Sequence, residues 1–530
     1  MNLIRNFSAE YEDYLHDESR IIGTADTIAF PKTEDEIREI VRYCVNNNIP
    51  MTVQGGRTGL TAAAVPEGGQ IINFSRMNKI TAARYDAEQN AFFLSVQPGL
   101  LLAELRKVID NKSFDISKWD EQSRDALTYF SAGKWTFSPD PTETSAAIGG
   151  IIGCNASGAR SFYFGAVRPY VEALRIVLAD GDLLEIRRGE NFANGRSFSL
   201  TTVSGHTISG QLPTYQMPVT KNAAGYYIAD DMDLIDLFIG SEGTLGIISA
   251  AELRLIPTAP VVWGISSFFN DEKTALRFVR ALRQEQLPGI ADIFKQRPVA
   301  IEFFNHSALA LLKEQKQHNP AFSQIQEIKE GSNCAVFTEF HSENEEYMWQ
   351  LLRDLLRLRE QLGEKEDNTW VATNSRDMEK LLFFRHAVPE CVNMLIDLRR
   401  QSDASIRKLG TDMAVPDDYL DAAMEMYNSD LLANQLDFAI WGHIGNNHLH
   451  VNILPRNAED FRRGKELYGQ WAGKVTFWGG TVSAEHGIGK FKKAFLLIMY
   501  GEKNIAQMRD LKKLFDPLML INRGNIFSEQ

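Results

Sequence analysis

Cysteine is scarce in this chain of 530 residues: it contains only four, Cys44, Cys154, Cys334 and Cys391, and no two of them form a C-x-x-C pair. This scarcity argues against a disulfide-stabilised scaffold and against a zinc finger or iron–sulfur cluster held by the cysteines of this chain. An excess of basic residues is missing as well, since 56 Lys and Arg face 69 Asp and Glu and the net charge is −13. We therefore expect no binding to nucleic acid, which requires a basic surface.

Long apolar segments are also lacking. Residues 1–7 contain one basic side chain, Arg5, and acidic residues rather than an apolar segment follow them, so we expect no secretory signal. No run of the sequence reaches the roughly 18–20 apolar residues that span a bilayer. We expect a cytoplasmic protein, with peripheral attachment to the inner face of a membrane left open.

The composition is that of a folded globular protein, with 44% hydrophobic and 24% charged residues, and the length indicates roughly three domains or subdomains. Residues 1–75 have an α/β pattern. Thr33 and Glu36 form a capping box ahead of a helix, and residues 49–54 and 69–74 are expected to be strands. The apolar face of that helix consists of Ile37, Ile40, Val41, Cys44 and Val45.

The middle of the chain changes character near residue 260. Before that point, strands are predicted at 91–96, 172–178 and 247–256, and residues 110–125 and 187–219 are expected to be surface insertions. After it, strands at 300–304, 334–341 and 370–373 each precede an amphipathic helix, predicted at 307–316, 343–362 and 376–399. This alternation favours a sheet with helices on one face. The last 60 or so residues are predicted to be mostly helical.

Three glycine-rich loops lie before residue 260, at 55–59, 149–158 and 240–246. Glycine has no Cβ, so its backbone N–H groups can approach a pyrophosphate closely. The first loop fits neither GxxxxGK[ST] nor GxGxxG, so neither a P-loop nor a Rossmann fingerprint is present. A single glycine turn is more often structural, but three in one block indicate a long cofactor that lies along the backbone.

Three of the ten histidines, His443, His448 and His450, fall within eight residues. Strands predicted at 438–442 and 448–454 with a turn at 445–447 form a hairpin, and the period of two places His448, His450 and Asn452 on one face. Imidazoles with a carboxylate, for which Glu485 is the candidate, are typical ligands of zinc and similar ions. The alternative is a hydrogen-bonded histidine network in a core or an interface.

Together these motifs resemble the FAD-linked oxidase family of the vanillyl-alcohol oxidase (PCMH) type, in particular its branch of D-lactate dehydrogenases, D-2-hydroxyglutarate dehydrogenases and large subunits of glycolate oxidase. The resemblance covers residues 31–527. It implies an α+β fold with a two-subdomain PCMH-type FAD-binding domain at 1–260 (subdomains of about 1–85 and 86–260). A substrate (cap) domain at 261–470 would hold an antiparallel sheet covered by helices, and a helical segment at 471–530 would return to the FAD-binding domain.

The resemblance implies that FAD is bound non-covalently, because residues 54–66 contain neither the His nor the Cys to which some relatives attach it. The residues that would contact FAD are Gln54, Gly55, Gly56, Arg57, Thr58, Gly59, Leu60, Thr61, Pro139, Asp140, Gly149, Gly150, Gly153, Asn155, Ala156, Ser157, Gly158, Gly240, Glu242, Gly243, Gly246, Ile247 and Asn522.

The family pattern around the histidines is G-H-x-G-D-G-N-L-H-x-N, followed by E-H-G. Carried over by position, it assigns a divalent metal ion, usually zinc, to His443, His450 and Glu485, the catalytic base to His486 and a substrate contact to Asn452. Where the family has Asp-Gly-Asn this chain has Asn446, Asn447 and His448, so His448 could add a ligand, shift the substrate or only fill space.

Two basic residues are candidates to hold the substrate carboxylate. Arg385 resembles a family arginine whose guanidinium can bind a carboxylate through two hydrogen bonds, and Lys408 resembles a family lysine with a different spacing. The implied activity is oxidation of a D-2-hydroxy acid, such as D-lactate or D-2-hydroxyglutarate, to the 2-oxo acid by hydride transfer to flavin N5.

The electrons would pass to a quinone, an electron-transfer flavoprotein or an iron–sulfur partner subunit. A flavin-using transferase like alkylglycerone-phosphate synthase and a non-catalytic flavoprotein subunit are the alternatives. The identity of the acid, the acceptor and a homodimeric state stay open.

Overall fold

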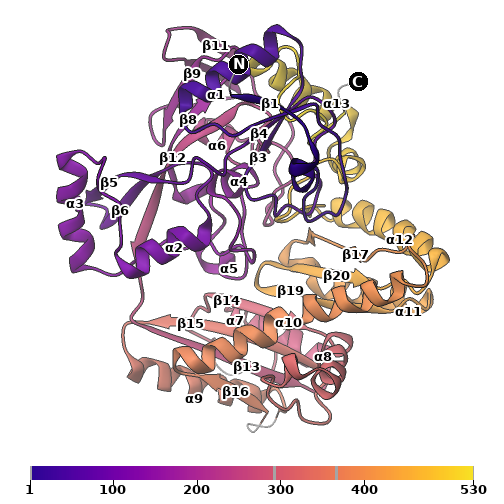
Figure 1. Ribbon diagram of the computed structural model, residues 1–530. Helices are drawn as coiled ribbons and strands as arrows, with labels where there is room; N and C mark the ends of the chain where they lie inside the picture. Colours follow the sequence, from indigo (N-terminus) through magenta and orange to yellow (C-terminus); the bar gives the residue numbers. More distant parts are fainter. Residues whose placement is uncertain (1–2, 291–293, 365–367, 529–530) are drawn as a thin grey trace.

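The computed structural model of the chain describes residues 3–290, 294–364 and 368–528. Helices and strands are mixed along the chain, as predicted for an α+β protein, and the strands form three large sheets and one separate hairpin (Figure 1). The first two sheets lie in the upper part of Figure 1 and the third sheet lies below them.

The first sheet has the strand order β1-β2-β4-β3, with β1 (Ile4–Asn6), β2 (Thr27–Ala29), β3 (Met51–Gln54) and β4 (Gln70–Asn73). Helix α1 (Glu34–Asn46) begins at the predicted cap, where Thr33 Oγ1 accepts a hydrogen bond of 3.2 Å from the backbone N–H of Glu36. Its predicted apolar face is buried against β3 and β4. The first glycine loop therefore starts directly at the end of a well-packed strand.

The second sheet is antiparallel, has the order β5-β6-β12-β8-β9 and takes the short β7 beside β12. Its strands are β5 (Ile80–Asp86), β6 (Ala91–Val96), β7 (Trp135–Thr136), β8 (Val171–Val177), β9 (Leu183–Arg187) and β12 (Ile247–Pro257). The helices among them are α2 (Leu102–Asn111), α3 (Glu121–Ala132), α4 (Ile148–Gly153), α5 (Ser161–Phe164) and α6 (Ile235–Phe238). The second glycine loop comprises α4 and the turn that follows it. The third glycine loop lies just before β12.

The two expected insertions are not simple surface loops. The first contains a loop and the start of α3, and its Trp119 is buried with its ring centroid 5.7 Å from that of Phe114. The second contains the hairpin β10 (Ser197–Thr201) and β11 (Thr207–Gln211), whose Phe198 stacks on Phe515 of the C-terminal helix. Both stretches thus contribute apolar side chains to the core, which their polar composition concealed.

The third sheet has eight strands in the order β16-β13-β15-β14-β19-β20-β17, with β18 beside β20, and its paired strands are antiparallel. They are β13 (Val261–Phe269), β14 (Ala300–Phe304), β15 (Cys334–Ser342), β16 (Thr369–Ala372), β17 (Leu409–Gly410), β18 (Met413–Ala414), β19 (Phe438–His443) and β20 (His448–Ile453).

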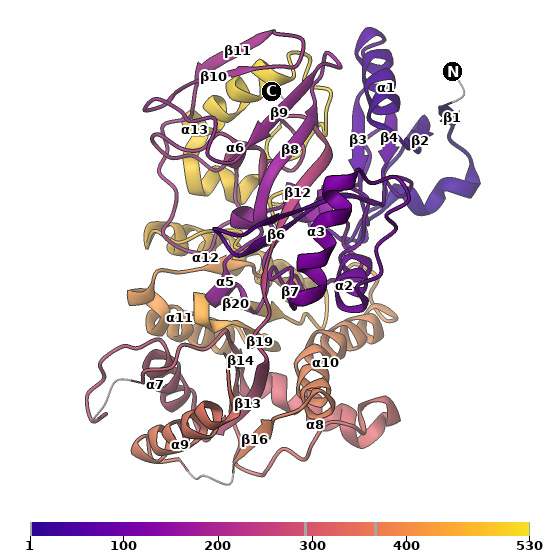
Figure 2. The same ribbon diagram turned by 90° about the vertical axis from the view of Figure 1, so that its left-hand side faces the viewer.

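Helices cover both faces of the third sheet, so the expectation of helices on one face is wrong. In Figure 2, α7 (Glu272–Leu282) and α9 (Glu345–Gln361) lie on one side of the strands and α8 (His306–His318) and α10 (Ser375–Arg400) on the other. The apolar residues form two separate clusters accordingly, with Phe269 and Phe268 of β13 in different ones. Every residue of β14 and of β19 is buried, which is typical of strands with packing on both faces.

The C-terminal part returns to the first two sheets, as the fold prediction requires. After α11 (Leu420–Ala433) and the hairpin, α12 (Ala458–Phe477) and α13 (Lys493–Phe515) run back beside the N-terminal half (Figure 1). The tail then pairs with β3, since Met51 N donates to Leu520 O and Asn522 N donates to Met51 O, both at 2.8 Å. Among the helices of the described ranges, none is long and apolar enough to cross a membrane.

Candidate active site

One cavity of about 880 Å³ is lined by all three glycine loops, the histidine hairpin, the loop between α12 and α13 and the C-terminal tail. Its volume is at the upper end of the range of about 300–1,000 Å³ that is usual for ligand sites. Of the predicted FAD contacts, the cavity is lined by Gly55, Gly56, Arg57, Thr58, Gly59, Leu60, Thr61, Gly149, Gly150, Gly153, Ala156, Ser157, Glu242, Gly243, Gly246, Ile247 and Asn522.

The other predicted FAD contacts do not line the cavity but support its walls. Gln54 Nε2 donates to the carbonyl oxygens of Tyr14 and Ala64, at 2.8 Å each. Asp140 forms an ion pair of 2.9 Å with Arg106. Pro139, Asn155, Gly158 and Gly240 do not line the cavity either. The sequence pattern therefore indicated loops that reach the cavity without separating the residues that line it from those that do not, and their contact with FAD stays a prediction.

Two glycines of the second loop leave open space in the cavity beside their own backbone. A Cβ atom built on Gly150 meets nothing within 4 Å, and one on Gly153 meets nothing closer than 3.9 Å, although both residues line the cavity. A side chain there would project into the cavity rather than against protein. The bare backbone of α4 is thus available to a phosphate-containing ligand, which is the chemistry of an FAD pyrophosphate.

Glu242 connects the third glycine loop with the loop that carries Glu485 and His486. Its carboxylate accepts hydrogen bonds from the backbone N–H groups of Ile488 at 2.6 Å and Gly489 at 2.8 Å. Burial raises the pKa of Glu242 to about 7 even though both hydrogen bonds favour the charged form. The wall of the glycine loops and the wall of the histidine cluster are therefore held together directly.

The predicted hairpin forms, and it brings the three histidines to one point. β19 and β20 are joined by a 3-10 turn at Ile444–Asn446, and the register pairs His443 with His448 and Trp441 with His450. Asn447, at the position of the family glycine, has φ 52°, a left-handed conformation that asparagine tolerates better than most residues. The departure from the family pattern at Asn447 therefore leaves the turn intact.

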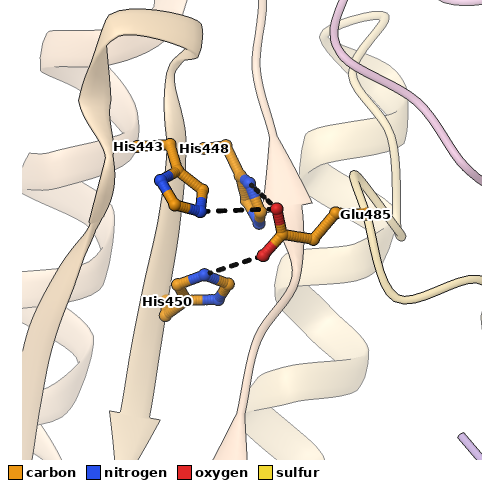
Figure 3. A group of neighbouring side chains, drawn as sticks. All are labelled: His443, His448, His450 and Glu485. Atoms are coloured by element: carbon orange, nitrogen blue, oxygen red, sulfur yellow. Dashed lines mark ion pairs between the residues drawn. The ribbon is translucent and has the colours of Figure 1, made fainter. Parts of the chain in front are cut away.

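Glu485 reaches this hairpin from the loop between α12 and α13, and the imidazoles surround its carboxylate (Figure 3). His443 Nε2 lies 3.3 Å from Glu485 Oε2, and His450 Nε2 lies 3.3 Å from Glu485 Oε1. The third imidazole, His448, places Nδ1 3.9 Å from Oε2. One potential ligand atom from each of these four residues lies within 4.8 Å of every other.

Each of the two histidines predicted as ligands has its second nitrogen held by an oxygen. His443 Nδ1 lies 2.7 Å from Glu302 Oε1, and His450 Nδ1 lies 3.2 Å from the carbonyl oxygen of Thr411. If these Nδ1 atoms carry the protons, the Nε2 lone pairs face Glu485. This arrangement is the usual one for metal-binding histidines, whose remote nitrogen donates to a carboxylate or a carbonyl group.

Asp412 organises the other side of the cluster, between β17 and β18. Its carboxylate lies 2.9 Å from His448 Nε2, 3.4 Å from His486 Nδ1 and 2.6 Å from Lys492 Nζ. It also accepts a hydrogen bond of 3.0 Å from the backbone N–H of His486. Asp412 thus fixes both the backbone and the ring of the predicted base.

Charges in the cluster favour a cation at Glu485. Burial opposes the charge on His443, but Glu302 and Glu485 outweigh it and raise the pKa of His443 to about 9. Burial lowers the pKa of His450 and holds that of His448 well below its ordinary value. Burial would raise the pKa of Glu485, yet Lys221, whose Nζ lies 2.7 Å from Oε2, and His443 hold it well below the usual range.

This donor set fits a divalent metal ion. His443 Nε2 and His448 Nδ1 are buried and accept or donate no hydrogen bond within the described ranges. Imidazoles and a carboxylate are ligands that zinc, iron and similar ions share. His443, His450 and Glu485, the predicted ligands, lie together as the pattern required, and their role as ligands stays a prediction.

The remaining predicted residues are divided between the cavity and its surroundings. His486, Asn452 and Lys408 line the cavity together with His450 and Glu485. The rings of His486 and His450 are stacked, with centroids 5.5 Å apart. Arg385 is buried behind the lining, where its charge contributes to lowering the pKa of Asp140 and of Glu302 against the opposing effect of burial. Of the four residues predicted to act on the substrate, three, His486, Asn452 and Lys408, therefore line the cavity, and Arg385 does not.

Sequence reasoning missed Glu302, Asp412, Lys221 and Lys492. Each comes from a different segment, and each reaches the cluster only through the tertiary fold. Glu302 offered one signal, because a glutamate inside the apolar strand β14 needs a partner when it is buried.

Comparisons with known proteins agree with this geometry. Residues 25–117 match the model of an FAD binding domain, and residues 265–526 match that of the C-terminal domain of FAD linked oxidases. The chain is 27% identical to a D-lactate dehydrogenase of Anaerostipes hadrus over 97% of this chain and 92% of the relative. It is 26% identical to a D-2-hydroxyglutarate dehydrogenase of Stutzerimonas stutzeri over 94% of this chain and 90% of the relative.

Two solved structures are similar in fold. A 4-ethylphenol oxidase from Gulosibacter chungangensis has a TM-score of 0.63 at 14% identity and covers 100% of this chain and 95% of its own. An alkyldihydroxyacetonephosphate synthase has a TM-score of 0.60 at 14% identity and covers 98% of this chain and 82% of its own. The predicted fold class is therefore confirmed.

Proposed function

Because the chain belongs to the FAD-linked oxidase family, with an FAD-binding domain and the family's C-terminal domain, we propose that it is a metal-assisted dehydrogenase of a D-2-hydroxy acid. The observation that carries the proposal is the single cavity that is lined both by the glycine loops and by His450, Asn452, Glu485 and His486. A flavin held by the loops and a substrate held at the cluster would share that space.

The chemistry explains why a base alone is insufficient. An alcohol is about as weak an acid as water, with a pKa of about 15.7, whereas imidazole has an ordinary pKa of about 6.5. A gap of about nine units costs on the order of 12 kcal/mol. A divalent ion held by His443, His450 and Glu485 would act as the Lewis acid that lowers this cost, much as it lowers the pKa of bound water to about 7.

His486 is the proposed base. Asp412 lies on the Nδ1 side of the His486 ring. The Nε2 atom of His486 lies 3.5 Å from Glu485 Oε1, on the side of the cluster where the hydroxyl group of a substrate would lie. A base oriented by a carboxylate is a common arrangement in enzymes. His486 would take the proton of the substrate hydroxyl group, while the hydrogen on the carbon that carries this group would leave as hydride. FAD, when bound, supplies the ring that accepts the electrons.

The substrate carboxylate requires a polar partner in the cavity. Asn452 and Lys408 line it, and the Lys408 ammonium is held by Asn393 Oδ1 at 2.8 Å. Arg385 lies deeper, so in this proposal its charge acts on the carboxylates around the site or reaches the substrate after a side-chain movement. Electrons would then pass from the flavin to a quinone, an electron-transfer flavoprotein or an iron–sulfur partner subunit.

A transferase of the alkyldihydroxyacetonephosphate synthase type is the second candidate, since such a protein has a similar fold. The dehydrogenase is favoured because the sequence relatives over nearly the whole chain include proteins named D-lactate dehydrogenase and D-2-hydroxyglutarate dehydrogenase. A transferase would retain flavin but would not reduce an artificial electron acceptor.

The test is turnover of an artificial acceptor by the purified, FAD-loaded protein with paired D- and L-2-hydroxy acids. We expect reduction with one or more D-acids and little with their L-enantiomers. Flavin-loaded protein that reduces no acceptor with any acid would overturn the dehydrogenase and favour the transferase.

A further inference from the structure

The third imidazole of the cluster, His448, stands where the family pattern has asparagine. It is completely buried at the turn end of β20, directly opposite His443 in the hairpin register. Its Nε2 lies 2.9 Å from Asp412 Oδ1, and its Nδ1 lies 3.9 Å from Glu485 Oε2. Figure 3 shows that its ring, like those of His443 and His450, faces the Glu485 carboxylate.

His448 divides its two nitrogens in the way that His443 and His450 do. In each ring, one nitrogen faces an oxygen outside the cluster, from Asp412, Glu302 or Thr411 respectively. The other nitrogen faces Glu485. Both nitrogens of His448 are buried and form no hydrogen bond of regular geometry in the part of the chain that the structure describes, although Nε2 lies 2.9 Å from Asp412 Oδ1. A buried imidazole lone pair of this kind needs a partner, and a cation at Glu485 would supply it.

The spacing of the ligand atoms is compatible with a common ion. Ligand atoms about 2.1 Å from one ion lie about 3.0–3.4 Å apart when adjacent and about 4.2 Å apart when opposite. Glu485 Oε2 lies 3.3 Å from His443 Nε2 and 3.9 Å from His448 Nδ1, and the 3.3 Å contact of His450 Nε2 is to the other oxygen, Oε1; one ligand atom from each of the four residues lies within 4.8 Å of every other. Small side-chain movements would bring them to bonding distance.

We propose that His448 is a fourth protein ligand of the metal ion, so that this chain holds it with three imidazoles and one carboxylate. The inference rests on the metal site of the proposed function and extends it to the kind of ion. Zinc usually takes four ligands, and catalytic zinc sites keep one of them free for water or substrate. Four protein ligands would leave no free position on a tetrahedral ion.

The donor set therefore selects an ion that accepts six ligands, such as Fe²⁺, Mn²⁺ or Co²⁺. A 2-hydroxy acid can chelate through its hydroxyl and carboxylate oxygens, and two positions remain for it beside His443, His448, His450 and Glu485. In this respect the chain would differ from relatives that have asparagine in place of His448.

One competing arrangement is visible in the structure. Lys221 Nζ lies 2.7 Å from Glu485 Oε2, so in this arrangement the lysine ammonium takes the place of the metal ion at Glu485. A second arises because Asp412, His450, Glu485 and His486 also have ligand atoms within 4.8 Å of one another. In that set His486, rather than His448, would complete the coordination.

The test is Co²⁺ binding to the FAD-loaded full-length protein after chelation, followed by X-ray absorption and visible spectroscopy. We expect three imidazole ligands and the weak visible absorption of a six-coordinate ion. His448→Asn should leave two imidazoles and reduce Co²⁺ affinity by more than the roughly 10–100-fold that changes outside the coordination sphere cause. The matched control is His486→Asn, which should keep three imidazoles and lose no more than the roughly 10–100-fold in affinity of a change outside the coordination sphere.

Two imidazoles in the unchanged protein would overturn the proposal whether or not His448→Asn folds. Loss of Co²⁺ affinity in His486→Asn alone would overturn it in favour of the second set. Absence of Co²⁺ binding until Lys221 is replaced by Met would make the lysine the cation. Flavin reduction by a D-2-hydroxy acid, measured on the same samples, reports separately on the proposed function.

Discussion

Glu242 provides a prediction whose magnitude follows from the structure. Its carboxylate is buried between the glycine loop and the backbone N–H groups of Ile488 and Gly489, and burial raises its pKa from 4.5 to about 7. The unfolded chain therefore loses this proton near pH 4.5, while the folded protein keeps it until about pH 7. The free energy of unfolding should fall across this window as the pH rises.

The size of that fall is about 3 kcal/mol, since each pKa unit corresponds to about 1.36 kcal/mol. Glu242→Gln has nearly the shape of the protonated side chain and does not titrate. Because the Gln amide NH2 cannot accept the second backbone hydrogen bond, the variant carries the same penalty at every pH, and we expect its stability relative to the unchanged protein to rise by about 3 kcal/mol between pH 4.5 and pH 7. A difference of about 3 kcal/mol corresponds to roughly 6–12 °C in the melting temperature of a unit of 150–250 residues.

The assay is the melting temperature of both proteins at pH 5 and pH 8, with and without FAD. Glu425→Gln, an exposed glutamate on α11, is the matched control and should shift the melting temperature equally at both pH values. A Glu242→Gln protein whose melting temperature, relative to that of the unchanged protein, does not rise from pH 5 to pH 8 would refute the reasoning.

Three further predictions concern the site. Gly150→Ala should lower FAD affinity, because its methyl group enters the cavity, and should stabilise the flavin-free protein by about 0.5–1 kcal/mol. The control, Gly469→Ala in α12, should give the same stabilisation without a change in FAD affinity. Flavin titration and thermal melting of both variants check this. His486→Gln should slow anaerobic flavin reduction by about 10²–10⁴-fold with flavin retained, and equal rates in stopped-flow measurements would contradict its role as base. Asp412→Asn should lower both the stability of the protein and its metal affinity, because Lys492 would lose its carboxylate partner. Unchanged metal content, measured by elemental analysis, would contradict this prediction.

Local patterns predicted the parts of the structure that local physics determines. The face of α1, the hairpin strands and the meeting of His443 with His450 follow from periodicities of 3.6 and 2 residues and from a turn that needs a left-handed residue. The covering of both faces of the third sheet by helices was not predicted, because the sequence of a strand that is buried on both sides looks like any short apolar segment.

The polar partners of the site depend on the tertiary fold. Asp412 lies in the connection between β17 and β18, Glu302 lies in a buried strand, and Lys221 lies in a loop after β11. No spacing along the chain relates these residues to Glu485. The family pattern assigns Arg385 to the substrate carboxylate; in the structure its side chain is buried and does not line the cavity, and that role stays a prediction. Burial and distance, which the sequence does not contain, decide these positions.

The central claim is that a metal ion and His486 act on a hydroxy acid beside the flavin. The most direct measurement is the anaerobic rate of flavin bleaching by D-lactate and D-2-hydroxyglutarate in chelated protein and in the same protein resupplied with a divalent metal ion. We predict that FAD stays bound in both samples and that bleaching by at least one D-acid occurs only in the resupplied sample. Bleaching at full rate after exhaustive chelation, or no bleaching by these acids with metal and FAD present, would contradict the account.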